Sequence, residues 1–158
     1  MVIYFGYEKK QVLQALRYHF ITRPEIKTLL IVVNIFTIIS AILLYMHKIQ
    51  PLSFLLFSLL WFLLIITVWT ILPGSIYKKN ETFRDTFSML INDNEVILKT
   101  NRGAHAWRWK DFSTFIESPY FFHLYFNSRS FFLVPKDAFN GILELQEVRA
   151  LLRQKIGK

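Results

Sequence analysis

Two long stretches without a charged residue constrain this chain more than any other feature. Residues 28–46 contain no Lys, Arg, Asp or Glu, and neither do residues 52–72. An α-helix rises about 1.5 Å per residue, so about 20 residues cross the hydrocarbon core of a bilayer. A surface helix of a soluble protein has a polar face, and neither stretch shows one. The sequence therefore predicts two transmembrane helices.

A cleaved signal peptide or a very apolar soluble bundle is the alternative. A signal peptide has its apolar core near the N-terminus, followed by small residues at a cleavage site. Here residues 1–27 precede the first stretch, they include several charges, and no small-residue pattern follows it. We therefore expect the first helix to be retained.

The distribution of basic residues predicts the topology. The connector, residues 47–51, is long enough only for a turn between two antiparallel helices, and Pro51 suits the first turn of the second helix. Of the 19 Lys and Arg residues, only Lys48 lies in this connector, whereas Lys78, Lys79 and Arg84 follow the second helix. The positive-inside rule then predicts a transmembrane hairpin at 28–73, ended by Pro73 and Gly74, with both termini in the cytoplasm. We expect the three cations after the hairpin to contact anionic lipid headgroups.

The N-terminal segment, residues 1–27, begins with an apolar stretch at 2–5 and continues with a helical pattern. In that pattern Val12, Leu13, Leu16 and Phe20 recur at helical spacing between basic residues. Such an amphipathic helix either lies on the inner surface of the membrane or packs on the cytoplasmic domain. Both alternatives remain open from the sequence.

Residues 75–136 change character to short aromatic and β-branched runs separated by turn residues. This pattern predicts about six antiparallel strands. Residues 137–156 then show an amphipathic helix, with Asp137 as its predicted N-cap. We therefore predict an α+β membrane protein in which a small antiparallel sheet or barrel, capped by a C-terminal helix, follows the hairpin. This is the plan of a pleckstrin-homology-like (PH-like) domain, and the stretch at 2–5 is a candidate for a seventh strand.

Several residues of the last part occur in an order that is typical of one family. They are the turn Asn92-Asp93-Asn94, Gly103 followed by Trp107, Leu124-Tyr125, and Pro135-Lys136 with Phe139. With the preceding hairpin, this order resembles the YcxB-like family of bacterial membrane proteins. The resemblance implies a cytoplasmic PH-like domain at 75–158, anchored in the bacterial cytoplasmic (inner) membrane as a multi-pass protein. It implies no catalytic residues, and Trp109 lies outside its pattern.

Residues suited to catalysis or metal binding do not gather in the sequence. The four histidines lie in four separate segments, the chain has no cysteine, and its five glycines form no phosphate-binding loop. No Gly-x-Ser-x-Gly motif accompanies the serines. We therefore predict no catalytic residue, no metal site and no cofactor, and a protein that is not an enzyme.

Two further groups of residues are candidates for interactions. Asn34, Thr37 and Ser40 share one face of the first apolar helix, where packing against another helix is favoured over a transport route.

The second group is Trp107, Arg108, Trp109 and Lys110, in which aromatic and basic side chains alternate. In a strand, Trp107 and Trp109 share one face. A core position for them is favoured, a membrane-facing surface is second and nucleic acid is last, so no nucleic-acid partner is predicted.

These observations predict a membrane-anchored, non-enzymatic protein. Its cytoplasmic domain is expected to bind a partner protein, to form a homo-oligomer, or to lie against lipid. The alternative is a small transport or immunity-type membrane subunit that acts through its hairpin.

Overall fold

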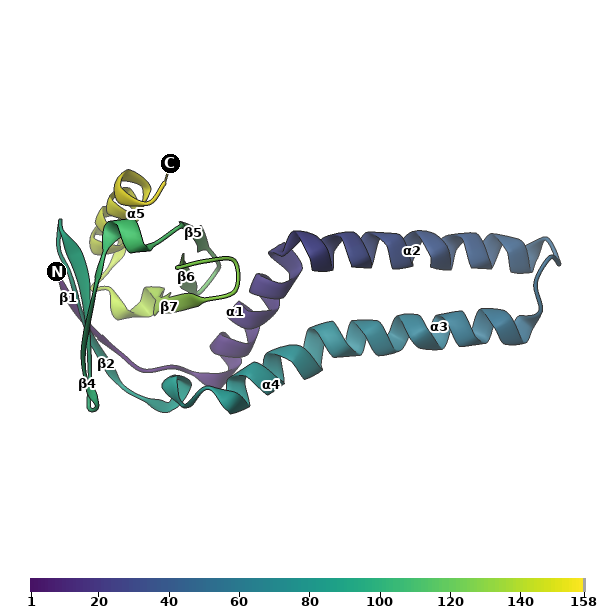
Figure 1. Ribbon diagram of the computed structural model, residues 1–158, viewed down its shortest axis with the longest axis horizontal. Coiled ribbons are helices and arrows are strands. Elements are labelled where there is room, and N and C mark those ends of the chain that lie inside the picture. Colours follow the sequence, from purple (N-terminus) through teal and green to yellow (C-terminus); the bar gives the residue numbers. More distant parts are fainter. Residues whose placement is uncertain (158) are drawn as a thin grey trace. The chain divides into compact units, whose positions relative to one another are not determined.

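The computed structural model describes residues 1–157 and divides into two compact units. The hairpin unit is Leu16–Asn80, and the sheet unit combines Met1–Ala15 with Glu81–Lys158. The sequence-based division at 1–27, 28–73 and 75–158 differs, because the first strand of the chain belongs to the sheet unit. The predicted α+β class is confirmed: two long apolar helices are followed by antiparallel sheets and a C-terminal helix (Figure 1).

The hairpin unit consists mainly of two antiparallel helices (Figure 1). α2 (Pro24–Tyr45) ends where His47 adopts a left-handed φ of 54° and the Lys48 N–H bonds the Leu43 carbonyl. α3 (Pro51–Ile66) begins with Pro51 in its first turn, as predicted. Their less exposed side chains recur at alternating steps of three and four residues, the spacing of a coiled-coil seam. They are Ile26, Leu30, Val33, Thr37, Ser40 and Leu44 on α2, and Phe54, Ser58, Trp61 and Ile65 on α3, followed by Val68 in the helical turn after α3.

The prediction that Pro73 and Gly74 end the second helix is wrong. α3 continues through a π-helical turn, η1 (Thr67–Ile71), into α4 (Leu72–Lys79), which contains both residues. Proline has no N–H and its ring clashes with the carbonyl four residues earlier, here that of Trp69. The π-turn widens the helix, with the Leu72 N–H bonding the Thr67 carbonyl five residues back, and so the helix passes the proline.

A further helix, α1 (Lys9–Thr22), contains residues of both units. Its apolar side, with Val12, Leu16 and Phe20, is buried. The helix ends before Pro24, where the Thr22 hydroxyl donates to the carbonyls of Tyr18 and His19.

The sheet unit contains seven strands in two antiparallel sheets. The larger sheet has the order β1-β2-β3-β4, formed by Val2–Phe5, Phe87–Ile91, Glu95–Thr100 and Gly103–Arg108. The smaller sheet has the order β5-β6-β7, formed by Thr114–Glu117, Phe121–Tyr125 and Phe131–Pro135. The candidate seventh strand is therefore present, and β1 pairs with β2 although the hairpin helices lie between them in the sequence.

The C-terminal helix α5 (Ile142–Lys155) begins later than predicted, and Asp137 does not cap it. Residues Lys136–Ala138 form a separate 3₁₀ turn, after which Phe139 is extended and buried in the core. Gly141, with a φ of 103°, then starts the helix. The core lies between the two sheets and α5, with Met89, Phe122 and Val148 among its fully or almost fully buried members.

Candidate interaction site

The polar residues of α2 make contacts within the hairpin unit. The hydroxyls of Thr37 and Ser40 donate to carbonyls of their own helix, at Val33 and Thr37. Asn34 reaches the other helix, because its Oδ1 accepts a hydrogen bond of 3.3 Å from Trp61 Nε1. The structure thus places these three residues at or beside the seam, where they can support helix packing.

The three cations expected at lipid headgroups are all exposed, but they lie in different units. Lys78 and Lys79 form the last turn of α4 in the hairpin unit, whereas Arg84 ends the 3₁₀ turn η2 (Glu81–Arg84) of the sheet unit. The two lysines are near the C-terminus of a helix, where positive charge is favoured by the helix dipole.

The basic and aromatic segment after Arg102 separates into buried rings and exposed cations. Trp109 is 6% exposed, and its Nε1–H donates to the Asn92 carbonyl at 3.0 Å. Trp107 is half-buried against Phe126 and Phe132, at ring-centroid distances of 5.3 and 5.9 Å.

The tryptophans do not alternate as one strand because β4 ends at Arg108 and Trp109 begins a 3₁₀ turn. Arg108 and Lys110 are exposed. Trp109 is therefore buried in the core, and Trp107 lies partly exposed at the edge of the core.

A cleft of about 400 Å³ lies beside β4 in the sheet unit. Aromatic rings of Phe87, Trp107 and Phe132 line it, and polar side chains at its rim include Asp85, Arg102 and His105. Arg102 forms two ion pairs: its guanidinium lies 3.2 Å from a carboxylate oxygen of Glu81 and 3.9 Å from one of Asp85. This cleft combines an apolar lining with ionisable groups, the usual composition of a recognition site.

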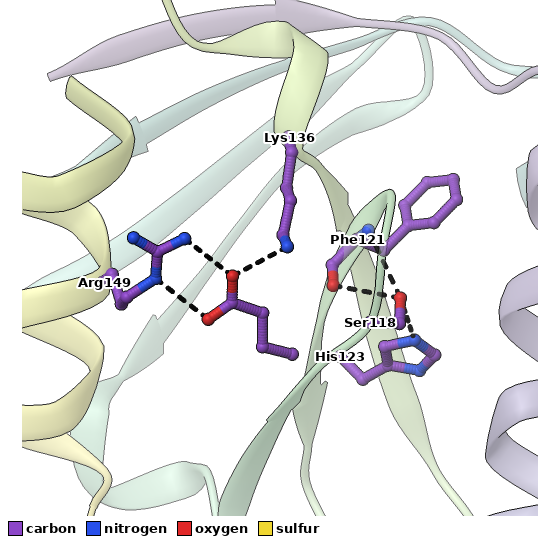
Figure 2. Close-up of polar contacts among 6 residues, drawn as sticks. Ser118, Phe121, His123, Lys136 and Arg149 are labelled. Carbon is purple, nitrogen blue, oxygen red and sulfur yellow. Dashed lines mark hydrogen bonds and ion pairs between the residues drawn. The ribbon is translucent and has the colours of Figure 1, made fainter. Parts of the chain in front are cut away.

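The most strongly perturbed carboxylate, that of Glu117, holds α5 to the smaller sheet (Figure 2). Arg149 donates to both of its oxygens at 2.9 and 2.7 Å, and Lys136 Nζ lies 2.7 Å from Oε1. The Arg149 hydrogen bonds, and then those of Lys136, lower the pKa of Glu117 to about 2. A carboxylate held by two cations in this way joins elements of the fold.

A serine and a histidine adjoin this cluster, and both are buried, with exposed fractions of 4% and 0%. The Ser118 hydroxyl donates to the Phe121 carbonyl at 3.1 Å and lies 2.9 Å from His123 Nε2 (Figure 2). Because the hydroxyl proton is used in that bond, we assign the proton between the two side chains to Nε2. The pair therefore fixes the turn between β5 and β6. Across residues 1–157, no three His, Asp or Glu side chains gather as metal ligands would.

Sequence reasoning missed two arrangements that the structure shows. The Glu117 cluster joins residues far apart in the chain, and no local pattern signals it. Arg17 Nε–H donates to the Trp69 carbonyl at 2.9 Å. This contact has a partial signal in the sequence, because Pro73 must leave the Trp69 carbonyl without its helical donor.

Residues 91–152 match the YcxB-like protein family, a segment that begins at the last residue of β2 and ends within α5. All the residues on which the sequence-based resemblance rests lie inside it, so the resemblance is confirmed for this segment. No curated protein and no solved structure matches the chain.

Proposed function

We propose that this is a membrane-anchored, non-enzymatic interaction protein. Its apolar helices span the bacterial cytoplasmic membrane as a hairpin with both termini in the cytoplasm. Its sheet unit is a PH-like domain that binds another protein at the membrane surface. The observation that carries the proposal is the exposure of the two apolar helices.

Only 6% of the residues in the apolar window of either helix are buried. A core helix of a soluble protein is mostly buried, and a monomeric soluble protein rarely exposes an apolar patch larger than a few hundred Å². Here phenylalanine, leucine and isoleucine side chains such as Phe36, Ile38 and Leu55 are more than half exposed. Lipid is the solvent that such a surface fits.

Charge supports the proposed orientation and the contact with lipid headgroups. The hairpin unit carries Lys48 at its connector, whereas Arg23, Lys27, Lys78 and Lys79 lie at the opposite ends of its helices. Each cation near an anionic leaflet contributes on the order of 1 kcal/mol to membrane binding. Lys78 and Lys79, with Arg84 in the sheet unit, are the residues that we assign to this contact.

The strand order supports the PH-like assignment and a binding role. Four strands and then three, followed by one C-terminal helix over the core, are the arrangement expected for that fold. The cluster of Glu117, Lys136 and Arg149 holds elements together, and the cleft beside β4 offers a place for a partner. A protein contact is therefore favoured over chemistry.

A second candidate function places the activity in the hairpin, as in a small transport or immunity-type subunit. It is favoured by Asn34, an exposed amide in the apolar part of α2 whose side chain accepts a hydrogen bond from Trp61. It predicts that Asn34→Ala abolishes association of the hairpin with its partner, whereas the proposed function predicts no effect.

The test is proximity crosslinking in native membranes, comparing the full chain with a chain that lacks residues 81–158. We expect partner crosslinks to disappear with the sheet unit, while the shortened chain still fractionates with membranes. Partners that persist after the deletion would assign the function to the hairpin.

A further inference from the structure

We propose that the free edge of β4 accepts an extended segment of a partner protein as an added strand. That segment places a basic side chain in the cleft lined by Trp107 and Phe132. The inference rests on the proposed function of the sheet unit as a protein-binding module, and it names the surface and the chemistry of the partner.

The hydrogen-bond pattern of the sheet shows which backbone groups of β4 are directed outward. The Asn92 N–H donates to the Glu95 carbonyl, so the backbone groups of Glu95 face β2. Because these directions alternate along a strand, the backbone groups of Val96, Leu98 and Thr100 face β4.

Their partners on β4 are Trp107, His105 and Gly103. The residues between them, Ala104 and Ala106, therefore direct their N–H and C=O groups away from β3. No other strand of residues 1–157 pairs with β4, which is the last strand of its sheet.

This edge lacks the features that usually prevent strand addition. Natural edge strands are protected by proline, by inward-pointing charges, by bulges or by a covering element. In β4 the outward-directed residues are Ala104, Ala106 and Arg108, and the N–H of Arg108 donates to Asp111 Oδ2. The free part of the edge therefore consists of two exposed alanines, whose small side chains leave the backbone accessible. The charged residues Arg102 and Arg108 lie only at the two ends.

The cleft beside this edge indicates what kind of side chain the added strand carries. Side chains alternate between the faces of a sheet, so every second residue of an added strand is on the same face as His105 and Trp107. Those residues line the cleft of about 400 Å³, with the Phe132 ring opposite. A long side chain on the added strand is therefore in reach of these rings.

The charges at the cleft favour a basic side chain. Arg102 is the one cation there that is paired with carboxylates, and it contacts both Glu81 and Asp85. Asp85 itself lines the cleft, whereas Glu81 lies outside the lining, so Asp85 is the carboxylate that a basic side chain of the added strand can meet. A lysine or arginine fits both features, because its aliphatic stem packs on rings and its charged end stays at the polar rim.

A second copy of this chain is a poorer occupant of the same edge. Antiparallel pairing of Ala104 with Ala106 of a second copy would place Arg102 opposite Arg108 of that copy. Like charges directly opposite one another on paired strands are destabilising. Charge therefore favours a different protein.

The test uses two fluorescent peptides and the full chain in lipid nanodiscs. Both are heptapeptides of alternating threonine and valine, and the central valine is replaced by lysine in one and by glutamate in the other. Fluorescence anisotropy gives the dissociation constants. We expect the lysine peptide to bind about fivefold more tightly than the glutamate peptide.

Matched proline variants identify the edge. Ala106→Pro removes an outward N–H of β4 and should weaken the lysine peptide at least about tenfold. Tyr4→Pro removes an outward N–H of β1, at the opposite edge of the same sheet, and should leave binding unchanged. If Tyr4→Pro and not Ala106→Pro blocks the peptide, the assignment to β4 is overturned.

Because a proline variant can also disturb folding, a second test changes only side-chain charge. Glu81→Gln combined with Asp85→Asn should remove the preference for lysine and leave the glutamate peptide at least as tightly bound. Equal affinity of the two peptides for the unaltered chain would overturn the inference.

A dimer of the full chain that Ala106→Pro dissociates would also overturn the inference, because a second copy would then occupy the edge. Crosslinks that depend on the sheet unit, without peptide binding, would leave the proposed function standing and refute only this inference.

Discussion

At the scale of single residues, Arg17 compensates for a proline in the second apolar helix. Pro73 has no N–H for the Trp69 carbonyl four residues earlier. Arg17 Nε–H donates to that carbonyl at 2.9 Å, and its guanidinium lies 5.2 Å from the centroid of the Trp69 ring. A backbone carbonyl in an apolar environment is costly without a donor, so this contact replaces the bond that proline removes.

We predict that Arg17→Met lowers the stability of the hairpin unit by about 1–3 kcal/mol. In a Pro73→Ala background the cost should fall below about half of that value, because the new Ala N–H serves the same carbonyl. Denaturation of the full chain in detergent, followed by circular dichroism, measures the four members of this cycle. Equal costs in both backgrounds would contradict the compensation.

Glu117 gives a prediction about pH. Its folded-state pKa of about 2 is below the ordinary value of 4.5, chiefly because Arg149 donates to the carboxylate. A lowered pKa means that the unfolded state binds more protons between these values, so the stabilisation is complete above 4.5 and is lost as the pH falls towards 2.

Glu117→Gln should therefore destabilise the protein by about 1–3 kcal/mol at pH 7. The difference from the unaltered chain should shrink between pH 4.5 and pH 2, as seen in urea titrations at several pH values. Glu144→Gln, on the first turn of α5, is the control and should leave this pH profile in place. A difference independent of pH would show that the carboxylate charge is not the cause.

At the scale of elements, β1 and β2 are paired strands that lie far apart in the sequence. Ile3 pairs with Met89, and the two side chains are 1% and 0% exposed. Tyr7 adds a second link, since its hydroxyl donates to the Leu133 carbonyl at 2.6 Å. The N-terminal strand is therefore part of the core of the sheet unit.

We predict that Ile3→Ala destabilises the sheet unit by about 2–5 kcal/mol, the range for deleting a buried aliphatic side chain. Val2→Ala on the exposed face of the same strand should cost less than about 0.5 kcal/mol. Hydrogen exchange of the β2 amides reports the effect at this element. Equal exchange in both variants would mean that β1 is not required for the sheet.

The sequence predicted most elements because their patterns are local. Charge-free stretches, strand alternation and turn residues identified the apolar helices, the antiparallel strands and the last helix. The errors arose where a distant contact decides. The helix continues past Pro73 because a π-turn and Arg17 accommodate it, and α5 starts late because Phe139 enters the core. Of the candidate site residues, Trp109 was expected to share one strand face with Trp107, preferably in the core. The strand ends at Arg108, and Trp109 is buried from the turn that follows it.

At the scale of the whole molecule, the proposed topology follows from where charge is tolerated. Lys48 is the only Lys or Arg in the connector, whereas both helix ends away from it carry basic residues. Moving these across a bilayer is unfavourable, which predicts that the connector is on the outer side. The same rule predicts that the sheet unit is cytoplasmic.

The absence of cysteine from the natural chain makes this topology directly testable. Lys48→Cys should react with a membrane-impermeant maleimide in intact spheroplasts, and Asn101→Cys should react only after lysis. Both side chains are exposed in the structure, so a failure to react means that the membrane separates the cysteine from the reagent, and not that the cysteine is buried in the protein. The unaltered chain should remain unlabelled. The reverse labelling pattern would show that the hairpin has the opposite orientation in the membrane. Labelling of both positions in intact spheroplasts would mean that the connector and the sheet unit lie on the same side. In that case the apolar helices could not cross the bilayer as a hairpin, and their exposed surface would require a protein partner to cover it.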